Sequence, residues 1–193
     1  MHVSFEKLRA LDDENCTRLR ALYEASNEPS IRKPFTEIAY GIASGRYICH
    51  VGVRANKIIA FAFLLPLATG HALLEYFAVD GELRGQGIGT AMMHWLAENN
   101  GKLVWEVEAL DIDVPRDDRQ RRIAFYERLG AKRVEHVDAY AMPDFETGDP
   151  NGVPLWLYSM SSEVGDVYEL VRAIYAAAYP AHHALRERIC QLR

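Results

Sequence analysis

The stretch YFAVDGELRGQGIGTAMMHWLAENNG, residues 76–101, places Gly85, Gly87 and Gly89 between an apolar segment and an amphipathic one. The apolar segment is typical of a buried strand. The residues that follow predict a helix over 87–99, because their apolar side chains recur with helical spacing. These side chains are Ile88, Ala91, Met92, Trp95 and Leu96. The glycines therefore mark the point where a strand passes into a helix.

Glycine residues at the start of a helix favour the binding of an anion. Glycine lets the backbone approach a ligand closely and adopt positive φ. The first N–H groups of a helix have no partner within it, and the helix dipole adds partial positive charge at the same end. Arg84 would add a cation, and the Thr90 hydroxyl one more donor. The pattern predicts a phosphate site, and more specifically a pyrophosphate site that several amides grip at once.

Two classes of phosphate-binding fold compete for this pattern. A dinucleotide-binding fold requires G-x-G-x-x-G, yet Gly85 and Gly87 are followed by Thr90 at the third position. That fold also requires an acidic residue about 20 positions further on, and Glu106 or Glu108 roughly fits. The motif nevertheless follows a predicted β-meander instead of opening a strand–helix–strand series. A P-loop is excluded, because no G-K-[ST] follows. A dinucleotide-dependent oxidoreductase is kept as an alternative.

The rest of the chain predicts one mixed α/β domain. Helices are expected over residues 11–26, 34–45, 121–130 and 162–180. Strands are expected over residues 47–53, 58–68, 72–79, 102–110, 132–142 and 153–160. Residues 181–193 are expected to form a short final helix. We place the boundary between a core domain, residues 1–161, and a helical extension packed on it, residues 162–193.

Composition excludes several classes of protein. The 193 residues include 22 Lys and Arg against 27 Asp and Glu, which gives a net charge of −5 and argues against a nucleic-acid binder. The cysteines are widely spaced without C-x-x-C, and the histidines lack metal-ligand spacing, so we expect neither disulfides nor a metal site. The longest apolar run, residues 58–68, is too short to span a bilayer, so no membrane partner is expected. Without a signal-peptide pattern, we expect a cytoplasmic protein.

Two stretches carry a resemblance to a known family. The segment RGQGIG, residues 84–89, matches the R/Q-x-x-G-x-G/A loop of the GNAT superfamily of acyl-CoA-dependent N-acyltransferases. Further along, IAFYERLGAKRVE, residues 123–135, resembles the second signature of that superfamily, a helix ending in F-Y-x-x-L-G before a strand. The late strand pair also resembles that of many members. The likeness extends from Phe5 to Met160, and two signatures in the expected order make it specific.

The resemblance implies a mixed sheet in which strands 72–79 and 102–110 splay apart and acetyl-CoA lies in the gap. Backbone groups of Phe77 and Val79 would hold the acyl-pantetheine arm, and amides near Val79 would polarise the thioester carbonyl. The pyrophosphate would be held by the loop residues Arg84, Gly85, Gln86, Gly87, Gly89 and Thr90.

The resemblance also implies a general acid and a base. Tyr126 matches the usual acid of the family, and a phenol can give a proton to the departing thiolate. We predict Glu75 as the base, on a strand face that it shares with Leu73 and Phe77, with a water relay as the alternative. No cysteine lies in either signature, so direct attack in a ternary complex is favoured over a covalent acyl-enzyme.

Further charged residues are assigned to the site. Glu106 and Glu108 share a face of the neighbouring strand and are expected to attract a cationic amine, unless that face is solvated. Arg119 stands where many family members have an asparagine, and we predict that it, Arg121 or Arg122 binds a CoA phosphate, with an exposed basic face as the alternative. Arg32 lies in the loop PSIRKP and is predicted to touch substrate together with Ile31 and Lys33, with a plain connecting loop as the alternative.

The sequence thus predicts an N-acetyltransferase that uses acetyl-CoA and needs no metal. The acceptor is a small-molecule or peptide amine that the sequence does not identify, and the protein is expected to be a monomer or a homodimer. A domain of this family that binds acyl-CoA without transferring the acyl group is the alternative outside enzymes.

Overall fold

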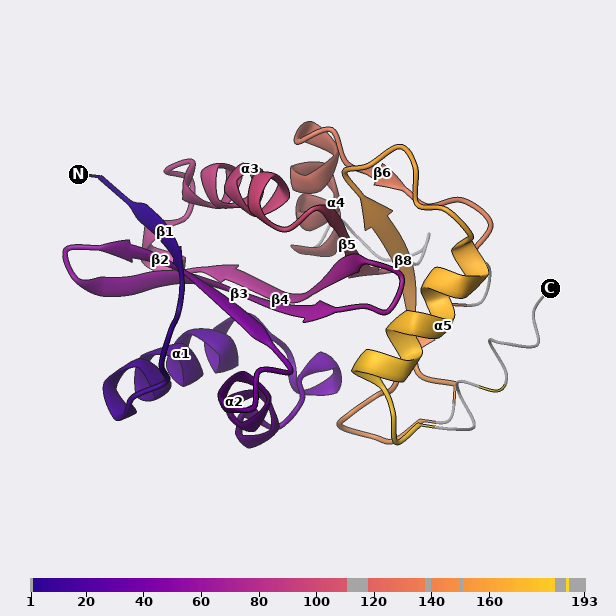
Figure 1. Cartoon of the computed structure of the whole chain (residues 1–193), viewed down its shortest axis with the longest axis horizontal. Helices are drawn as coiled ribbons and strands as arrows, with labels where there is room; N and C mark the ends of the chain where they lie inside the picture. The colour runs from indigo at the N-terminus through magenta and orange to yellow at the C-terminus, as the bar shows by residue number, and fades with distance from the viewer. Residues whose placement is uncertain (1, 111–117, 138–139, 150, 183–186, 188–193) are drawn as a thin grey trace.

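An open β-sheet with helices on both faces organises the chain (Figure 1). The structure is a computed structural model, and it describes residues 2–110, 118–137, 140–149, 151–182 and 187. The final helix predicted over residues 181–193 falls almost entirely outside the described residues.

The sheet has eight strands in the order β1-β2-β3-β4-β5-β8-β6, and β7 pairs with β8 off this path. The strands are β1 (Ser4–Lys7), β2 (Ile48–Arg54), β3 (Lys57–Pro66), β4 (His71–Val79), β5 (Lys102–Glu108), β6 (Lys132–Arg133), β7 (Ala141–Met142) and β8 (Val153–Ser159). Among these described strands, neighbours pair antiparallel except for β4 and β5. A dinucleotide-binding fold needs several adjacent parallel strands, so the oxidoreductase alternative has no support in this topology.

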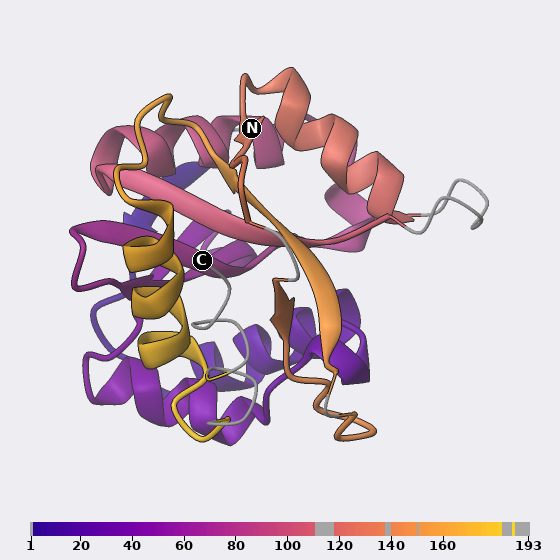
Figure 2. The ribbon, with the colours of Figure 1, turned by 90° about the vertical axis from the view of Figure 1, so that its right-hand side faces the viewer.

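The helices form a layer on each face of the sheet. They are α1 (Asp13–Ser26), η1 (Pro29–Ile31), α2 (Phe35–Ala43), η2 (Gly81–Leu83), α3 (Ile88–Asn99), α4 (Asp118–Arg128) and α5 (Val167–Ala178), where η marks a 3₁₀-helix. Figures 1 and 2 show α3 and α4 on one face and α1, α2 and α5 on the other. Each face has its own cluster of buried apolar side chains, so the sheet is covered on both sides.

Local sequence signals set several boundaries. Asp12 caps α1, since its side chain accepts a hydrogen bond from the Asn15 backbone N–H at 2.8 Å. The β2–β3 hairpin turns through Ala55 and Asn56, whose φ angles of 51° and 58° are those that a two-residue type I′ turn requires. Gly87 is the residue that precedes α3.

The long strand predicted over residues 132–142 is wrong. In its place β6 and β7 are two short strands that pair with opposite ends of β8. Between them His136 has a φ of 63°, which takes the backbone out of the extended conformation.

Three other element boundaries differ from the predictions. The last helix was expected from residue 162 but begins at Val167, because Gly165 has a φ of 71° and Asp166 caps the helix. Helix α4 begins at Asp118, before the start expected at residue 121. Strand β1 was not predicted at all, because its four residues are too few to establish a period.

Strands β4 and β5 separate partway along their length, as the resemblance predicted. Their parallel pairing runs from His71↔Lys102 to Leu74↔Trp105 and includes no later residue. Beyond that point β4 stays paired with β3 as far as Val79, and β5 stays paired with β8 as far as Glu108. The two halves of the sheet therefore diverge, and the facing edges of β4 and β5 are open.

A β-bulge in β4 sets the direction of Glu75. Phe63 of β3 pairs with Tyr76, whereas the next residue, Leu64, pairs with Leu74. Glu75 is thus the extra residue of a bulge, and such a residue shifts the alternation of side chains along its strand.

The bulge overturns one prediction from the sequence. Leu73 packs in the core under α1, α2 and α5, whereas Phe77 packs against the core under α3 and α4. The prediction that Leu73, Glu75 and Phe77 share one face is therefore wrong. Glu75 instead meets Lys33 and Tyr47 on the side of α2 and α5.

Helix α5 buries an apolar stripe in the core that it shares with α1 and α2. The buried residues are Leu170, Val171, Ile174, Tyr175 and Ala178. At the end of the helix, Arg46 Nη2 donates to the Ala177 carbonyl at 3.1 Å. None of the helices in the described part of the chain combines the length and the apolar composition needed to cross a bilayer.

Candidate active site

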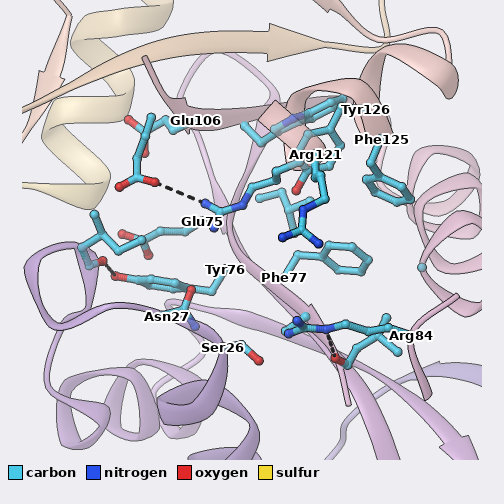
Figure 3. Close-up of a pocket in the computed structure, with 18 of the residues that line it drawn as sticks. Ser26, Asn27, Glu75, Tyr76, Phe77, Arg84, Glu106, Arg121, Phe125 and Tyr126 are labelled. Carbon is cyan, nitrogen blue, oxygen red and sulfur yellow. Dashed lines mark hydrogen bonds and ion pairs between the residues drawn. The ribbon is translucent and has the colours of Figure 1, made fainter. Parts of the chain in front are cut away.

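A cavity of about 900 Å³ opens where β4 and β5 separate (Figure 3). Its lining comes from the end of α1 and the loop after it, β4, the 83–90 loop, β5, α4, β7, β8 and the residue that follows α5. Most of the predicted cofactor-binding residues line it, namely Phe77, Val79, Arg84, Gly85, Gly87, Gly89 and Thr90. Glu75, Glu106, Glu108 and Tyr126 line it as well.

The loop before α3 is anchored at its start. Asp80 caps η2 by accepting a hydrogen bond from the Glu82 backbone N–H at 3.1 Å. Arg18 of α1 forms an ion pair with the Asp80 carboxylate and donates through Nε to the Ile58 carbonyl at 2.8 Å. The Arg18 hydrogen bond holds the pKa of Asp80 below its usual value. The entry to the loop is thereby fixed to α1 and β3.

Two glycines give the loop its backbone conformation. Gly85 and Gly87 both have a φ of 76°, and a Cβ atom at either position would meet no atom within 4 Å. The space in front of the loop is therefore open. The Ala91 N–H donates to the Gly87 carbonyl at 3.0 Å, so the N–H groups of the preceding residues lie at the helix end, where anions bind. Arg84 stands beside them, with Nε 3.4 Å from the Val79 carbonyl.

The structure gives less support to the predicted roles of Gln86 and Gly89 than to those of Gly85 and Gly87. Gln86 does not line the cavity, and its Oε1 accepts a hydrogen bond from Arg54 Nη1 at 3.2 Å. Gly89 does line it, but a Cβ atom there would lie 3.5 Å from the Phe125 ring and 3.6 Å from the Val79 side chain, which is ordinary contact. Space alone therefore does not require glycine at position 89.

Helix α4 presents two aromatic rings to the cavity. Tyr126 is 6% exposed, and its ring centroid lies 5.0 Å from that of Trp105. Burial raises the pKa of Tyr126 to about 12, while Arg122 acts in the opposite direction. The phenol therefore keeps its proton at neutral pH. The Phe125 ring stacks on the Phe77 ring, with 6.5 Å between the two ring centroids, so Phe125 faces β4 across the cavity.

Glu75 forms a buried ion pair. Its Oε1 lies 2.5 Å from Lys33 Nζ, both side chains are 3% exposed, and the Tyr47 hydroxyl donates to its other oxygen. Lys33 Nζ also donates to the Ala178 carbonyl at 2.6 Å. Lys33 thus neutralises the charge of Glu75, and its ammonium group is already bonded to Glu75 and to the Ala178 carbonyl.

Glu106 has a different environment. The hydroxyls of Tyr140 and Tyr179 both donate to its carboxylate, that of Tyr179 at 2.6 Å. Burial raises the pKa of Glu106 to about 7, and the nearby Glu75 adds to this rise. The two tyrosine hydrogen bonds and Lys33 act in the opposite direction. Glu106 is therefore a carboxyl group that exchanges its proton near neutral pH.

The other residues predicted for the site are Glu108, Arg32 and Arg119, and they do not lie together. Glu108 lies 3.7 Å from Arg122 of α4 and lines the cavity as an ion pair. Arg32 does not line it, because Nη1 donates to the Glu24 carbonyl at 2.9 Å near the end of α1. Arg119 does not line it either, whereas Arg121 of the same helix does.

Sequence reasoning missed the roles of Lys33, Tyr140 and Tyr179. Lys33 was expected to touch substrate and not to pair with Glu75, and neither tyrosine was given a role at the site. No spacing in the sequence connects either tyrosine to Glu106, since they lie 34 and 73 residues away.

Known proteins share both the sequence motif and the fold. Residues 45–130 match the family model described as Acetyltransferase (GNAT) domain. The Bacillus subtilis (strain 168) protein named "Putative acetyltransferase YjbC" is 28% identical over 90 residues, which are 47% of this chain and 45% of that protein. The match thus spans about half the length of this curated relative. Residues 45–130 therefore have the sequence of a GNAT acetyltransferase domain.

Solved structures extend the likeness of fold to almost the whole chain. A GNAT-family protein from Bacteroides thetaiotaomicron superposes with a TM-score of 0.75 at 21% identity, covering 90% of this chain and 96% of that one. An aminoglycoside 6′-N-acetyltransferase complexed with coenzyme A superposes with a TM-score of 0.63 at 15% identity, covering 84% and 99%. At these identities the likeness confirms the predicted fold.

The Lys33–Glu75 pair generates a prediction about stability. Lys33→Met should lower the free energy of unfolding by about 3–5 kcal/mol, because it leaves the Glu75 carboxylate buried without a cation. The double variant Lys33→Met/Glu75→Gln should recover part of that loss, since it removes both charges. Urea unfolding followed by circular dichroism measures both. A double variant that is less stable than Lys33→Met would contradict this account.

Proposed function

We propose that this protein transfers an acetyl group from acetyl-CoA to a primary amine, which attacks the thioester directly. The observation that carries the proposal is the cavity between β4 and β5, which connects an anion-binding loop with Tyr126 and Glu106. A structural neighbour with the same fold is complexed with coenzyme A, and this supports the same co-substrate for this chain.

The CoA part of the proposal rests on the loop and on the open edge of β4. Arg84 and the first amides of α3 would hold the pyrophosphate, since they combine a cation with unpaired N–H groups. Backbone groups of Phe77 and Val79 would hold the pantetheine arm, because an unpaired strand edge offers N–H donors and carbonyl acceptors. Arg121 lines the cavity and would add positive charge for a phosphate, the role predicted for Arg119.

The acid in this chemistry is Tyr126. The amine nitrogen forms a bond to the thioester carbonyl carbon, and the carbon–sulfur bond breaks in the following step. The departing thiolate then takes a proton, which the Tyr126 hydroxyl can donate because its raised pKa keeps it protonated at neutral pH. The nitrogen loses its extra proton on becoming an amide, and that proton restores the Tyr126 phenol.

The base is Glu106 in this proposal, in place of the predicted Glu75. An ammonium acceptor must lose a proton before its nitrogen can attack. Glu75 and Glu108 are each paired with a cation, whereas Glu106 receives its hydrogen bonds from two neutral tyrosine hydroxyls. Its pKa of about 7 suits a group that accepts a proton from the acceptor and releases it to water.

Gly87→Ala should weaken acetyl-CoA binding roughly tenfold. Alanine at a φ of 76° costs about 1–2 kcal/mol, and its methyl group would occupy the open space in front of the loop. Gly81→Ala is the matched control, since Gly81 has no left-handed φ and an added Cβ there meets no atom within 4 Å. Isothermal titration calorimetry with acetyl-CoA measures both variants. Equal acetyl-CoA dissociation constants for Gly87→Ala and Gly81→Ala would show that the loop does not bind acetyl-CoA.

Tyr126→Phe should lower kcat by about 10²-fold while leaving the acetyl-CoA dissociation constant unchanged, because only the proton donor is lost. Tyr158→Phe is the control, since the Tyr158 hydroxyl donates to Glu127 at 3.3 Å and does not line the cavity. Release of free thiol in the presence of a primary amine measures the rate. An undiminished kcat would show that another group protonates the thiolate.

The pH dependence should report on Glu106. The base acts only when deprotonated, so kcat/KM should rise with pH through about 7, the pKa of Glu106. Glu106→Gln should remove this rise and lower the rate about 10²-fold. Lys33→Met/Glu75→Gln should keep the rise, because it removes two opposite charges near Glu106. The reverse pattern, with the rise lost only in the double variant, would return the role to Glu75.

A further inference from the structure

Charge is divided between two sides of the cavity. Figure 3 shows Glu75, Glu106 and Asn27 on one side and Arg84 and Arg121 on the other. The arginine side lies at the loop and at α4, where the proposed function puts acetyl-CoA. The side that faces α1 and α5 is therefore the one left for the acceptor.

The acceptor side has a net negative charge. Lys33 neutralises Glu75, and Tyr140 and Tyr179 bring hydrogen bonds but no charge to Glu106. Together with burial, these four groups account for the shift in the pKa of Glu106. Glu108, two positions along β5, lines the cavity as an ion pair with Arg122, and this pair adds no net charge. Glu106 therefore keeps its own charge above its pKa.

The rim of this side adds a second negative charge. Glu28 lies exposed in the loop after α1, lines the cavity and makes no cap hydrogen bond to η1. Within the described ranges, neither the α1–η1 segment nor β7, β8 and the end of α5 contributes a Lys or Arg to the lining. The other lining residues from these elements are uncharged: Ala25, Ser26, Asn27, Ile31, Met142, Leu155 and Tyr179.

We propose that the acceptor is a cationic primary amine that has no carboxylate next to its amino group and whose remaining part is uncharged or positively charged. The ammonium group meets Glu106, and its carbon chain packs on Tyr76, Met142 and Leu155. An α-amino acid is disfavoured, because its carboxylate would lie close to Glu106, and the cations near that place, Lys33 and Arg122, are already paired with Glu75 and Glu108. This inference rests on the proposed acetyl transfer and narrows its substrate class.

Matched pairs of acceptors test the inference. Tyramine is tyrosine without its carboxylate, and phenethylamine is phenylalanine without its carboxylate, so only the amino acid of each pair carries a negative charge next to the amino group. With the full chain and saturating acetyl-CoA, kcat/KM should be at least about tenfold higher for the amine than for the amino acid of the same pair. The ratio within a pair cancels differences in chain length and shape.

A charge reversal at the rim sharpens the test. Glu28→Lys should lower the ratio of amine to amino acid about threefold at low salt, and added salt should return it toward the wild-type value. Glu163→Lys makes the same change in net charge at an exposed residue that does not line the cavity, and its ratio should stay at the wild-type value.

The outcomes separate this inference from the transferase proposal. Amino acids that react as well as their amines, or a ratio that Glu28→Lys leaves unchanged, would overturn the acceptor class and leave acetyl transfer standing. If neither kind of acceptor reacted while calorimetry still showed acetyl-CoA binding, both the acceptor class and the transfer would fail, and an acyl-CoA-binding module would be the better description.

Discussion

The site depends on one interruption of backbone hydrogen bonding, since β4 and β5 stop pairing after Leu74 and Trp105. Buried backbone groups without partners are costly, so a sheet does not normally open at its centre. Here β3 and β8 stay paired with the outer edges of the two strands, which keeps each strand extended while its inner edge is free. The unpaired groups then face a cavity, where a ligand can supply the missing partners.

Three carboxylates reach this cavity from β4 and β5, and their partners give them different chemistry. Lys33 holds Glu75 and Arg122 holds Glu108, so each belongs to an ion pair. Glu106 receives hydrogen bonds from neutral tyrosines, which orient it without supplying a positive charge. A carboxyl group that is buried in this way has a raised proton affinity, and this is the property that a general base near neutral pH needs.

The sequence predicted those features that depend on residues near one another in the chain. The glycine loop, the helix after it and the β2–β3 turn all follow from local spacing, whereas the place of Tyr126 follows from the resemblance of its segment to the second GNAT signature. The direction of Glu75 did not, because the bulge exists only through the pairing of β4 with β3. Tyr179 was missed for a similar reason, since it reaches Glu106 across 73 residues of chain.

The end of α5 connects these features through electrostatics. The last carbonyls of a helix carry partial negative charge, and two of them accept hydrogen bonds from Lys33 and Arg46. Tyr179 follows directly and donates to Glu106. The same helix end that binds Lys33 therefore lies beside Glu106, on the side of the cavity that we propose for the acceptor. Its partial charge has the same sign as that of Glu106, so both favour a cation there and disfavour an anion.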